Sequence, residues 1–179
     1  WDKARCVAVF PELRNTDFVV GAKDGKGVIT CRTGDRWSAP AFIEMDKGKR
    51  MYQLGADQLA VVLLVMTESA VQTLMRQHVT LGADVSVAPG PIGDQAHIDF
   101  NTHVADVLTY TRAQGLYMNI AGAVLESDDT ANRDVYGRGA SLRMLLAAVP
   151  APTDAHGFLA ELTNPPTPPG VNPQWQSAP

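Results

Sequence analysis

The chain has 179 residues, of which 45% are hydrophobic and 19% are charged, and this length and composition suit one folded domain with an apolar core. Its longest unbroken apolar run covers residues 59–66, far short of the roughly 20 residues of a membrane-spanning helix, so such a helix is excluded. A formal net charge of −4 argues against a general nucleic-acid binder, because those domains are usually basic.

The charges are unevenly distributed along the chain. Residues 1–50 hold ten of the 15 Lys and Arg, including every lysine, against seven of the 19 Asp and Glu. A basic segment of this kind can face an anionic partner such as a membrane surface. The alternative is a chance cluster of solvated charges.

Short apolar runs separated by turn residues predict strands through most of the chain. The first run is expected to end at Pro11, and the polar turns at residues 23–26 and 46–49 predict two hairpins. The run 59–66 is apolar at every position, which is typical of a strand covered on both faces. The expected strands are residues 6–10, 18–22, 27–32, 41–45, 50–56, 59–66, 79–88, 104–111 and 116–125.

Helical spacing replaces the strand pattern in three places. Residues 68–76 follow Thr67, whose side chain can cap a helix N-terminus. Residues 141–149 and 153–162 also have helical spacing, the second with Thr153 as its expected cap. The predicted class is therefore α+β: mostly antiparallel strands in hairpins, barrel-like or sandwich-like, with flanking helices in a single domain.

A change of composition near residue 164 marks the expected end of this domain. Residues 1–163 form the predicted domain, and residues 164–179 are rich in proline and polar side chains. Such a composition is typical of a disordered or polyproline-like tail.

Three glycines, Gly21, Gly25 and Gly27, lie between two of the predicted strands. Their spacing is not that of a phosphate-binding loop, which also opens a helix, and we interpret them as residues of a tight hairpin. Lys23 and Lys26 at the tip of this hairpin are expected to project into solvent and attract anions.

No pattern in the sequence predicts catalysis, a cofactor or a metal. His97, Asp99 and His103 lie close together, but their spacing matches no common zinc pattern, and we interpret them as solvated loop residues. Asp128 is interpreted as a helix N-cap rather than as part of a calcium loop. A nucleophile elbow of the GxSxG type is absent. These patterns identify no catalytic residue and predict no cofactor, and an enzyme is left as an open alternative at this point.

Trp37 follows the cations Arg32 and Arg36 and precedes Phe42. An aromatic ring beside cations is typical of peripheral membrane binders, in which the ring lies among the headgroups and the charge contacts phosphate. The alternative is a core tryptophan beneath a loop.

Two cysteines, Cys6 and Cys31, are the only ones in the chain. Without a CxxC motif or a Cys/His cluster, a structural zinc site is not predicted. If they face each other on paired strands, a disulfide would stabilise the fold by about 3 kcal/mol, and an oxidising compartment would favour it. The alternative is two buried free thiols.

Seven strings of residues are arranged along the chain as in one known family. They are CVAVFP, FVVGAKDGKGVITCR, WSAPAF, VVLLVM, TLGADVSVAPGPIG, YTRAQGLY and GAVLESDDTANRDVYG. In this order and spacing they resemble the SYLF family, a lipid-binding domain shared by bacterial proteins and by eukaryotic membrane and actin adaptors. The resemblance covers residues 3–163.

The resemblance implies mostly antiparallel strands with flanking helices, binding to phospholipids (phosphoinositides in the eukaryotic members) and no catalytic activity. It is strongest for secreted or lipid-anchored bacterial members, so it implies a periplasmic or cell-envelope location and favours a bond between Cys6 and Cys31. Family members also carry a lipid-binding helix before the CVAVFP position, of which only residues 1–5 are expected here.

The sequence thus predicts a non-enzymatic domain of the bacterial envelope that binds anionic phospholipids, with other envelope proteins as possible partners. The alternative is a structural or protein-interaction scaffold without a specific lipid ligand. From charge clustering, the expected lipid-binding residues are Lys23, Lys26, Arg32, Arg36, Trp37, Lys47, Lys49 and Arg50.

Overall fold

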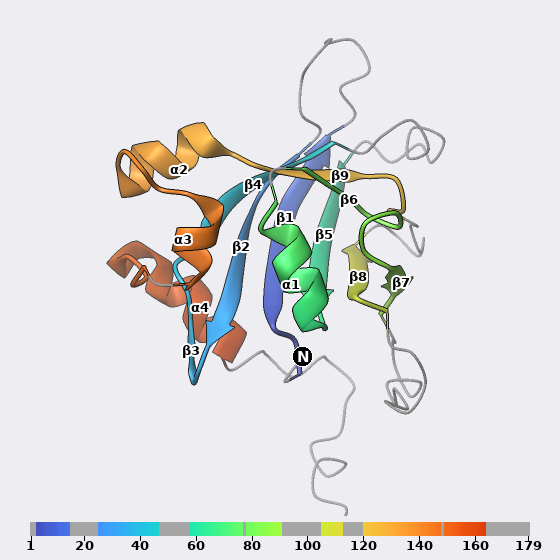
Figure 1. Cartoon of the computed structure of the whole chain (residues 1–179), viewed down its shortest axis with the longest axis horizontal. Helices are drawn as coiled ribbons and strands as arrows, with labels where there is room; N and C mark the ends of the chain where they lie inside the picture. The colour runs from blue at the N-terminus through green and yellow to red at the C-terminus, as the bar shows by residue number, and fades with distance from the viewer. Residues whose placement is uncertain are drawn as a thin grey trace, which may run out of the picture.

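The computed structural model of the chain describes residues 3–14, 25–46, 58–76, 78–90, 105–112, 120–147 and 149–163. Several predictions lie outside these residues: the strands at 18–22 and 50–56, the turn at 47–49, the His97–His103 segment and the tail from residue 164. The described residues form an α+β fold, as the sequence predicts, in which one curled sheet is covered by short helices (Figure 1).

The described residues contribute nine strands to the sheet, and their order is β6-β9-β4-β2-β1-β5-β8-β7, with β3 paired to β2. Neighbouring strands are antiparallel except for β7 and β8, which run parallel. The strands are β1 (Cys6–Arg14), β2 (Gly25–Thr33), β3 (Arg36–Trp37), β4 (Ala41–Asp46), β5 (Gln58–Val65), β6 (His78–Thr80), β7 (Val87–Pro89), β8 (Val107–Arg112) and β9 (Val124–Ser127).

The first and last strands in this order, β6 and β7, are consecutive in the sequence, so the sheet must curl. Strands β6 and β7 are separated only by residues 81–86, which contain a bridge between Leu81 and Val85. The single strand expected over 79–88 is therefore wrong. Gly82 has a φ of 83°, which favours glycine, and the Asp84 carboxylate accepts a hydrogen bond of 2.7 Å from the Thr80 N–H. These two features form a turn that ends β6.

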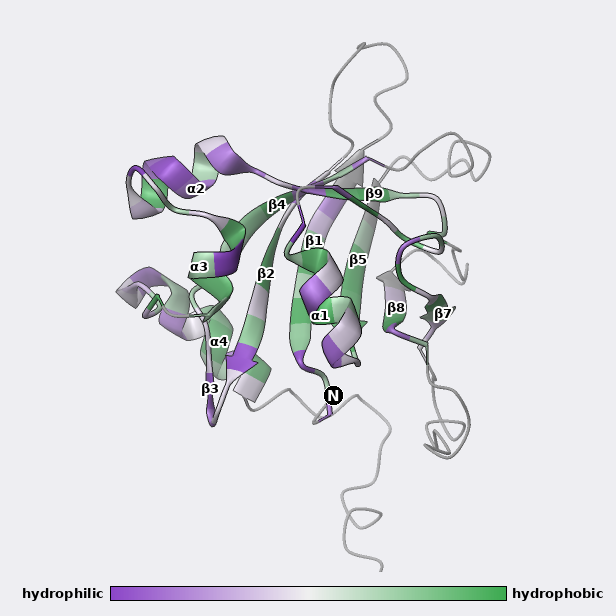
Figure 2. Cartoon of the chain, in the orientation of Figure 1, coloured by the Kyte–Doolittle hydropathy of each residue, from purple (hydrophilic) through white to green (hydrophobic). Residues whose placement is uncertain are grey.

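Both faces of the central strands are buried, each in its own apolar cluster. Along β1, Cys6, Ala8 and Phe10 lie in the inner cluster, whereas Val7 and Val9 lie in the outer one, because successive side chains on a strand point to opposite faces. Strand β5 divides in the same way, which confirms the prediction of a strand covered on both sides. Figure 2 shows the hydrophobic colour along these central strands.

The helices cover the two clusters. They are α1 (Glu68–Leu74), α2 (Asp129–Tyr136), α3 (Leu142–Ala147) and α4 (His156–Thr163), the last preceded by a 3-10 turn at Thr153–Ala155. Helices α1 and α3 contribute to the inner cluster, and α4 packs on the outer one through Phe158, Leu159 and Leu162. No helix within the described ranges has the length and apolar character needed to span a bilayer.

Two of the three side chains that the sequence predicts as helix N-caps have that role in the structure. The Thr67 hydroxyl accepts from the Ala70 N–H at the start of α1, and Asp128 accepts from the Ala131 N–H at the start of α2. Thr153 is not a cap, because it already lies inside the 3-10 turn that begins after Pro152.

Several strand boundaries differ from the prediction, three of them for a reason that the structure shows. Strand β1 continues past Pro11 to Arg14, and its register with both neighbours shifts around this proline, as in a β-bulge. A bulge tolerates proline because it leaves a backbone position without a ladder hydrogen bond. Gly25 and Lys26 belong to β2 rather than to a turn. Within the described residues, a turn at Gly122, with a φ of 94°, precedes β9, which starts at Val124, so only residues 124–125 of the strand expected over 116–125 are in a strand.

Cys6 and Cys31 face each other on β1 and β2 and form a disulfide, with their Cα atoms 3.9 Å apart. Both side chains are buried in the inner cluster. The bond therefore joins the first strand of the sheet to the end of its neighbour at a point that the hydrogen-bond ladder already pairs.

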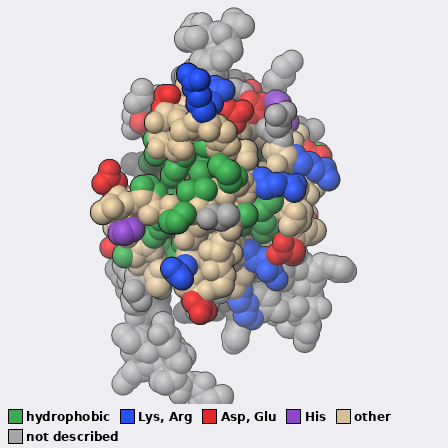
Figure 3. All heavy atoms as spheres, turned by 60° about the vertical axis from the view of Figure 1, so that its left-hand side comes forward, with side chains coloured by type: hydrophobic (Ala, Val, Ile, Leu, Met, Phe, Trp, Pro, Cys, Tyr) green, Lys and Arg blue, Asp and Glu red, His purple; other side chains and the backbone are tan. Residues whose placement is uncertain are grey.

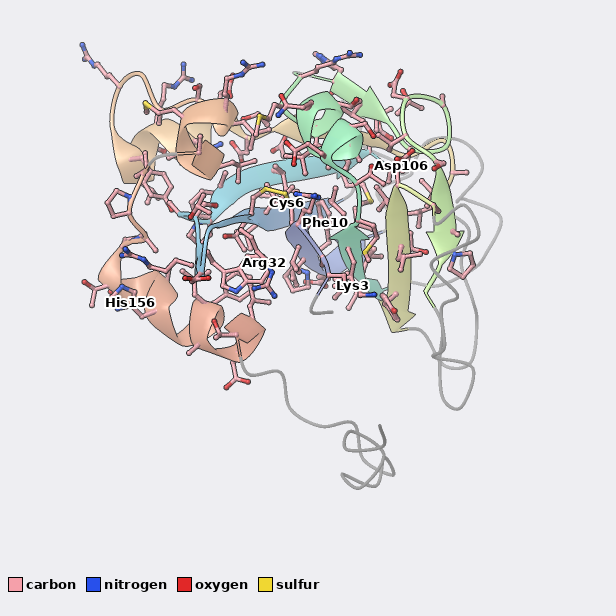
Figure 4. The ribbon with its side chains drawn as sticks, turned by 60° about the horizontal axis from the view of Figure 1, so that its bottom comes forward. Lys3, Cys6, Phe10, Arg32, Asp106 and His156 are labelled. Carbon is pink, nitrogen blue, oxygen red and sulfur yellow. A yellow bond between two sulfur atoms is a disulfide. The ribbon has the colours of Figure 1, made fainter. Side chains whose placement is uncertain are left out.

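The Asp106 carboxylate, just before β8, connects several elements by hydrogen bonds. It accepts hydrogen bonds from the Thr67 hydroxyl (2.6 Å), the Ser86 hydroxyl (2.7 Å) and the Ser86 N–H (3.0 Å). The Thr67 and Ser86 bonds hold the pKa of the Asp106 carboxyl below its ordinary value. One ionised side chain thus connects the start of α1, the start of β7 and the start of β8 (Figure 4).

We expect the double substitution Cys6→Ala/Cys31→Ala to lower the free energy of unfolding by about 3 kcal/mol, because the unfolded chain loses a covalent loop closure. The midpoint of thermal unfolding should then fall by roughly 6–12 °C. Reducing agent should shift the midpoint of the unsubstituted protein and leave that of the variant unchanged. Two titratable thiols per chain in the unfolded, unreduced protein would contradict this account.

We expect Asp106→Asn to lower the free energy of unfolding at pH 7 by about 1–2 kcal/mol, because hydrogen bonds to a charged acceptor are weakened. The pKa of Asp106 in the folded protein lies below its pKa in the unfolded chain, which is near 3.9. The stabilisation by the ionised carboxylate is therefore fully present above the unfolded-state pKa. It is lost as the pH falls through the folded-state pKa. Urea unfolding at pH 7 and pH 3 measures the difference. An equal difference between protein and variant at both pH values would contradict the assignment.

Candidate anion-binding site

The turn between β2 and β3 separates two cavities at one end of the sheet. Arg32 pairs with Trp37 and Thr33 with Arg36 across this turn, and Gly34 within it has a φ of 66°, which favours glycine. One cavity, of about 650 Å³, lies toward α1, and the other, of about 710 Å³, lies toward α4. We call them the basic cavity and the helical groove.

The basic cavity has a charged rim and an apolar wall. Lys3, Arg5 and Arg32 line it together with one carboxylate, Glu68. Apolar side chains from the end of β5, from α1 and from α3 form the wall, and the disulfide lies against it: Met66, Val71, Met75, Leu146, Ala147 and Cys6–Cys31. Figure 4 shows Lys3, Arg32 and Cys6 at the same end of the molecule.

Arg32 is held in place by three contacts. Its backbone N–H donates to the Arg5 carbonyl (2.7 Å), and its Nε donates to the Ala4 carbonyl (3.1 Å). Its guanidinium carbon lies 4.4 Å from the centre of the Trp37 ring, a distance at which a cation is attracted to the aromatic face. Within the described ranges, no hydrogen bond is made by the two terminal nitrogens of Arg32.

Arg5 lies next to Arg32 on the neighbouring strand end. Its Nη1 is 3.1 Å from a Glu68 carboxylate oxygen at the start of α1, and both side chains are more than half exposed. An exposed pair of this kind contributes little to stability. The charged residues that line the basic cavity are thus three cations and one carboxylate.

Four of the residues predicted to bind lipid lie in the described part of the chain, and they do not form one group. Arg32 lines the basic cavity, whereas Arg36 and Trp37 line the helical groove across the turn. Lys26 lies six positions before Arg32 on β2, about 20 Å away along an extended strand. Lys23, Lys47, Lys49 and Arg50 lie outside the described residues.

Lys26 lies in β2 rather than at a hairpin tip, and its side chain, which is 74% exposed as expected, forms ion pairs. Its Nζ is 2.9 Å from an Asp128 oxygen and 3.5 Å from a Glu44 oxygen, and the hydrogen bond to Asp128 raises the pKa of the Lys26 ammonium above its ordinary value. Burial alone would raise the pKa of the Asp128 carboxyl, but hydrogen bonds from Ala131 and Lys26 outweigh it and hold that pKa below its ordinary value. Lys26 therefore joins β2 to the start of α2.

Trp37 is a buried residue, which is the second of the two interpretations that the sequence left open. It is 8% exposed and belongs to the outer cluster with Ala4, Val7 and Leu162. Its indole nitrogen is also buried and has no hydrogen-bond partner within the described part of the chain. The ring supports Arg32 from below instead of reaching out to a lipid interface.

Apolar and polar residues line the helical groove in similar number. Val149, Pro150, Leu159 and Ala160 line it, with Asp35, Arg36 and His156 also among its lining residues. Figure 3 shows hydrophobic side chains gathered on the face that carries α3 and α4.

Sequence reasoning missed Lys3, Arg5 and the apolar wall. A signal for Arg5 was present: if Cys6 pairs with Cys31 on antiparallel strands, then Arg5 lies opposite Arg32. The residues of the wall come from β5, α1 and α3, and no spacing in the sequence indicates that these elements meet. Among the described residues, no group of three or more His, Cys, Asp or Glu could hold a metal ion.

The fold and the site define an α+β domain with an amphipathic cavity rimmed by cations. The family model Ysc84, described as a Las17-binding protein actin regulator, matches residues 47–164. The chain belongs to this family, which is also the SYLF family that the sequence motifs resemble.

Curated relatives support this assignment. LAS seventeen-binding protein 3 of Saccharomyces cerevisiae is 30% identical over 152 residues, which are 81% of this chain and 33% of that protein. The SH3 domain-containing YSC84-like protein 1 of Xenopus laevis is 30% identical over 161 residues, 86% of this chain and 48% of that protein. The chain therefore spans less than half the length of these relatives. Their names refer to LAS17 binding and to SH3 domains, not to a chemical reaction.

We expect Lys26→Gln to lower the midpoint of thermal unfolding, because Asp128, whose side chain is only 8% exposed, loses its cationic partner. Arg36→Gln is the matched control, since the exposed Arg36 side chain has no ion pair within the described residues. Differential scanning calorimetry of both variants measures the effect. Equal midpoints would show that the Lys26–Asp128 pair does not stabilise the fold.

Proposed function

We propose that this domain binds anionic phospholipids through the cations around the basic cavity, and that it acts by binding rather than by catalysis. The observation that carries the proposal is that three cations, Lys3, Arg5 and Arg32, line one cavity at the end of the sheet. Membership of the SYLF family supports it.

The expected strength of binding follows from the charges. Each Lys or Arg near an anionic membrane surface contributes about 1 kcal/mol. Lys3, Arg5 and Arg32, with Arg36 on the other side of the turn, are therefore sufficient for weak binding that depends on the salt concentration. Lys26 is a weaker candidate, because two carboxylates already neutralise it.

We also propose that the domain works outside the reducing cytoplasm, in the periplasm or at the cell envelope. The Cys6–Cys31 disulfide supports this location, since such bonds persist in oxidising compartments. Alkylation of thiols in intact cells before extraction provides the test. Protein with no alkylated cysteine is the expected result, and protein alkylated at both cysteines would contradict the location.

A protein partner is the second candidate function. The family description and the names of two relatives refer to binding of Las17 and to SH3 domains. In this alternative the domain is a scaffold, and the helical groove is the surface that the partner would cover. It predicts no preference for anionic over neutral lipid.

Co-sedimentation with vesicles separates the two functions. We expect the protein to bind vesicles that contain phosphatidic acid or phosphatidylglycerol, to ignore vesicles of pure phosphatidylcholine, and to dissociate as salt rises from 50 to 500 mM. Arg32→Gln and Arg5→Gln should each reduce the bound fraction. Arg143→Gln is the control, because Arg143 is exposed on α3 and lines neither cavity.

Two outcomes would contradict the lipid proposal. One is absence of binding to anionic vesicles at low salt. The other is an equal loss of binding in Arg32→Gln and Arg143→Gln, which would show that total charge matters and the cavity does not.

A further inference from the structure

We infer that the helical groove is a site for a proline-rich segment in the polyproline II conformation, and that residues 165–169 of this chain occupy it when no other partner is bound. These residues read PPTPP and follow closely on the last residue of α4. The inference does not rest on lipid binding by the basic cavity. It goes beyond the proposed function because it gives the second cavity an occupant and a means of control.

The groove follows one face of α4 from the first residue of the helix to the last. His156, Leu159, Ala160 and Thr163 all line it, and their spacing of three and four positions places them on the same face of a helix. A second, overlapping face of α4 packs on the outer cluster and holds the helix against the sheet. The groove is therefore bounded along one side by a fixed helix.

The other side of the groove comes from the segment that follows α3. Val149, Pro150 and Ala151 line it, and the Val149 carbonyl accepts a hydrogen bond of 3.2 Å from the Ala39 N–H, which ties this segment to the sheet. Figure 3 shows hydrophobic side chains gathered on this face. Apolar side chains that gather in one place, rather than lying singly, mark an interaction surface.

Trp37 gives the groove a feature by which proline-rich ligands are recognised. It is one of the lining residues, and grooves that bind polyproline II segments are lined by aromatic rings. Its indole N–H is buried and unpaired among the described residues, a costly state that an added carbonyl relieves. A polyproline II segment offers such carbonyls, because it makes no internal hydrogen bonds.

The charges of the groove suit a segment that carries none. Apart from His156, the charged residues of the lining are Asp35 and Arg36, and their formal charges cancel. Residues 164–179 contain no Asp, Glu, Lys or Arg. A charged peptide gains no net attraction from this lining, whereas residues 165–169 enter it without burying a charge.

The sequence after α4 has the length needed to return along the groove. Asn164 precedes a proline, a position that disfavours helical backbone, which accounts for the end of α4 at Thr163 and allows the chain to reverse. The eight residues of α4 span about 12 Å at about 1.5 Å per residue. Five residues of polyproline II cover about 15 Å at about 3.1 Å per residue. Residues 165–169 thus match the length of the groove.

A cover that is tethered in this way controls access to the groove. Only one residue separates the segment from α4, so its effective concentration at the groove is on the order of millimolar. A proline-rich segment of another protein therefore has to compete with residues 165–169 before it can bind.

Nuclear magnetic resonance of the full chain tests the contact directly. We expect nuclear Overhauser effects between the ring protons of residues 165–169 and the methyl groups of Leu159 and Ala160. Ala160→Glu places a charged side chain in the groove from an exposed position and should abolish them. Gly157→Glu is the matched control, because Gly157 is exposed on the same helix, does not line the groove and has open space where a Cβ would be added.

A peptide of sequence NPPTPPGV, the same as residues 164–171, measures the competition. Pro166→Ser/Pro168→Ser weakens the polyproline II preference of the tethered segment, so the peptide should bind this variant and shift the Trp37 indole signal. Pro173→Ser/Pro179→Ser also replaces two prolines but leaves residues 165–169 intact. We expect the peptide to bind this control, and the unsubstituted protein, about tenfold more weakly, because the tethered segment competes with it.

Three results would overturn the inference: absence of the Overhauser effects in the unsubstituted protein, their persistence in Ala160→Glu, or equal peptide affinity for the two double variants. Effects that appear only as the protein concentration rises would also overturn it, because a second copy would then cover the groove. Thermal unfolding establishes that each variant is folded; if Ala160→Glu is not, His156→Glu, at an exposed position of the same lining, takes its place.

Vesicle binding distinguishes the failure of this inference from that of the proposed function. Normal binding to anionic vesicles without the contacts of residues 165–169 would remove the inference alone. The contacts without vesicle binding would support the inference and remove the lipid proposal.

Discussion

The pairing of Cys6 with Cys31 is the constraint on which the rest of the structure depends. It fixes the register of β1 against β2, the two strands at the middle of the sheet. Because side chains alternate along a strand, that register decides which residues enter the inner cluster and which the outer one. It also decides that Arg5 and Arg32, the next pair outward, end side by side at the rim of a cavity. The Cys6–Cys31 pair in the core thus determines where Arg5 and Arg32 of the basic cavity lie.

The curl of the sheet gives the cavity its apolar wall. The ends of the strand order, β6 and β7, are joined by a few residues, so the sheet encloses the inner cluster, and α1 and α3 cover it. Met75 and Leu146 at their ends line the same cavity as Lys3, Arg5 and Arg32. Apolar surface and positive charge therefore meet where the core reaches solvent, an arrangement that suits an amphiphilic ligand.

Residue patterns predicted the fold better than the site. Apolar runs located β5, α1 and most of β2 and β4, and motif order identified the family, because these signals are local. Pro11 and Gly82 misled the prediction: a bulge lets β1 continue past the proline, and a turn at the glycine divides one expected strand into two edges of the sheet. Charge clustering found Arg32 but grouped it with Lys26, whose partner Asp128 lies 102 positions away in sequence. Only tertiary contacts separate a paired cation from an available one.

The most direct test of the central claim is a nuclear magnetic resonance titration of labelled protein with anionic and neutral nanodiscs. The account predicts that the largest shifts on anionic discs occur at the Arg32 side-chain Nε–H and at the backbone amides of Arg5, Gly34 and Val71. Neutral discs should leave these signals in place. Shifts confined to the helical groove, or to the end of β2 that carries Lys26, would show that lipid binds elsewhere and would contradict the account.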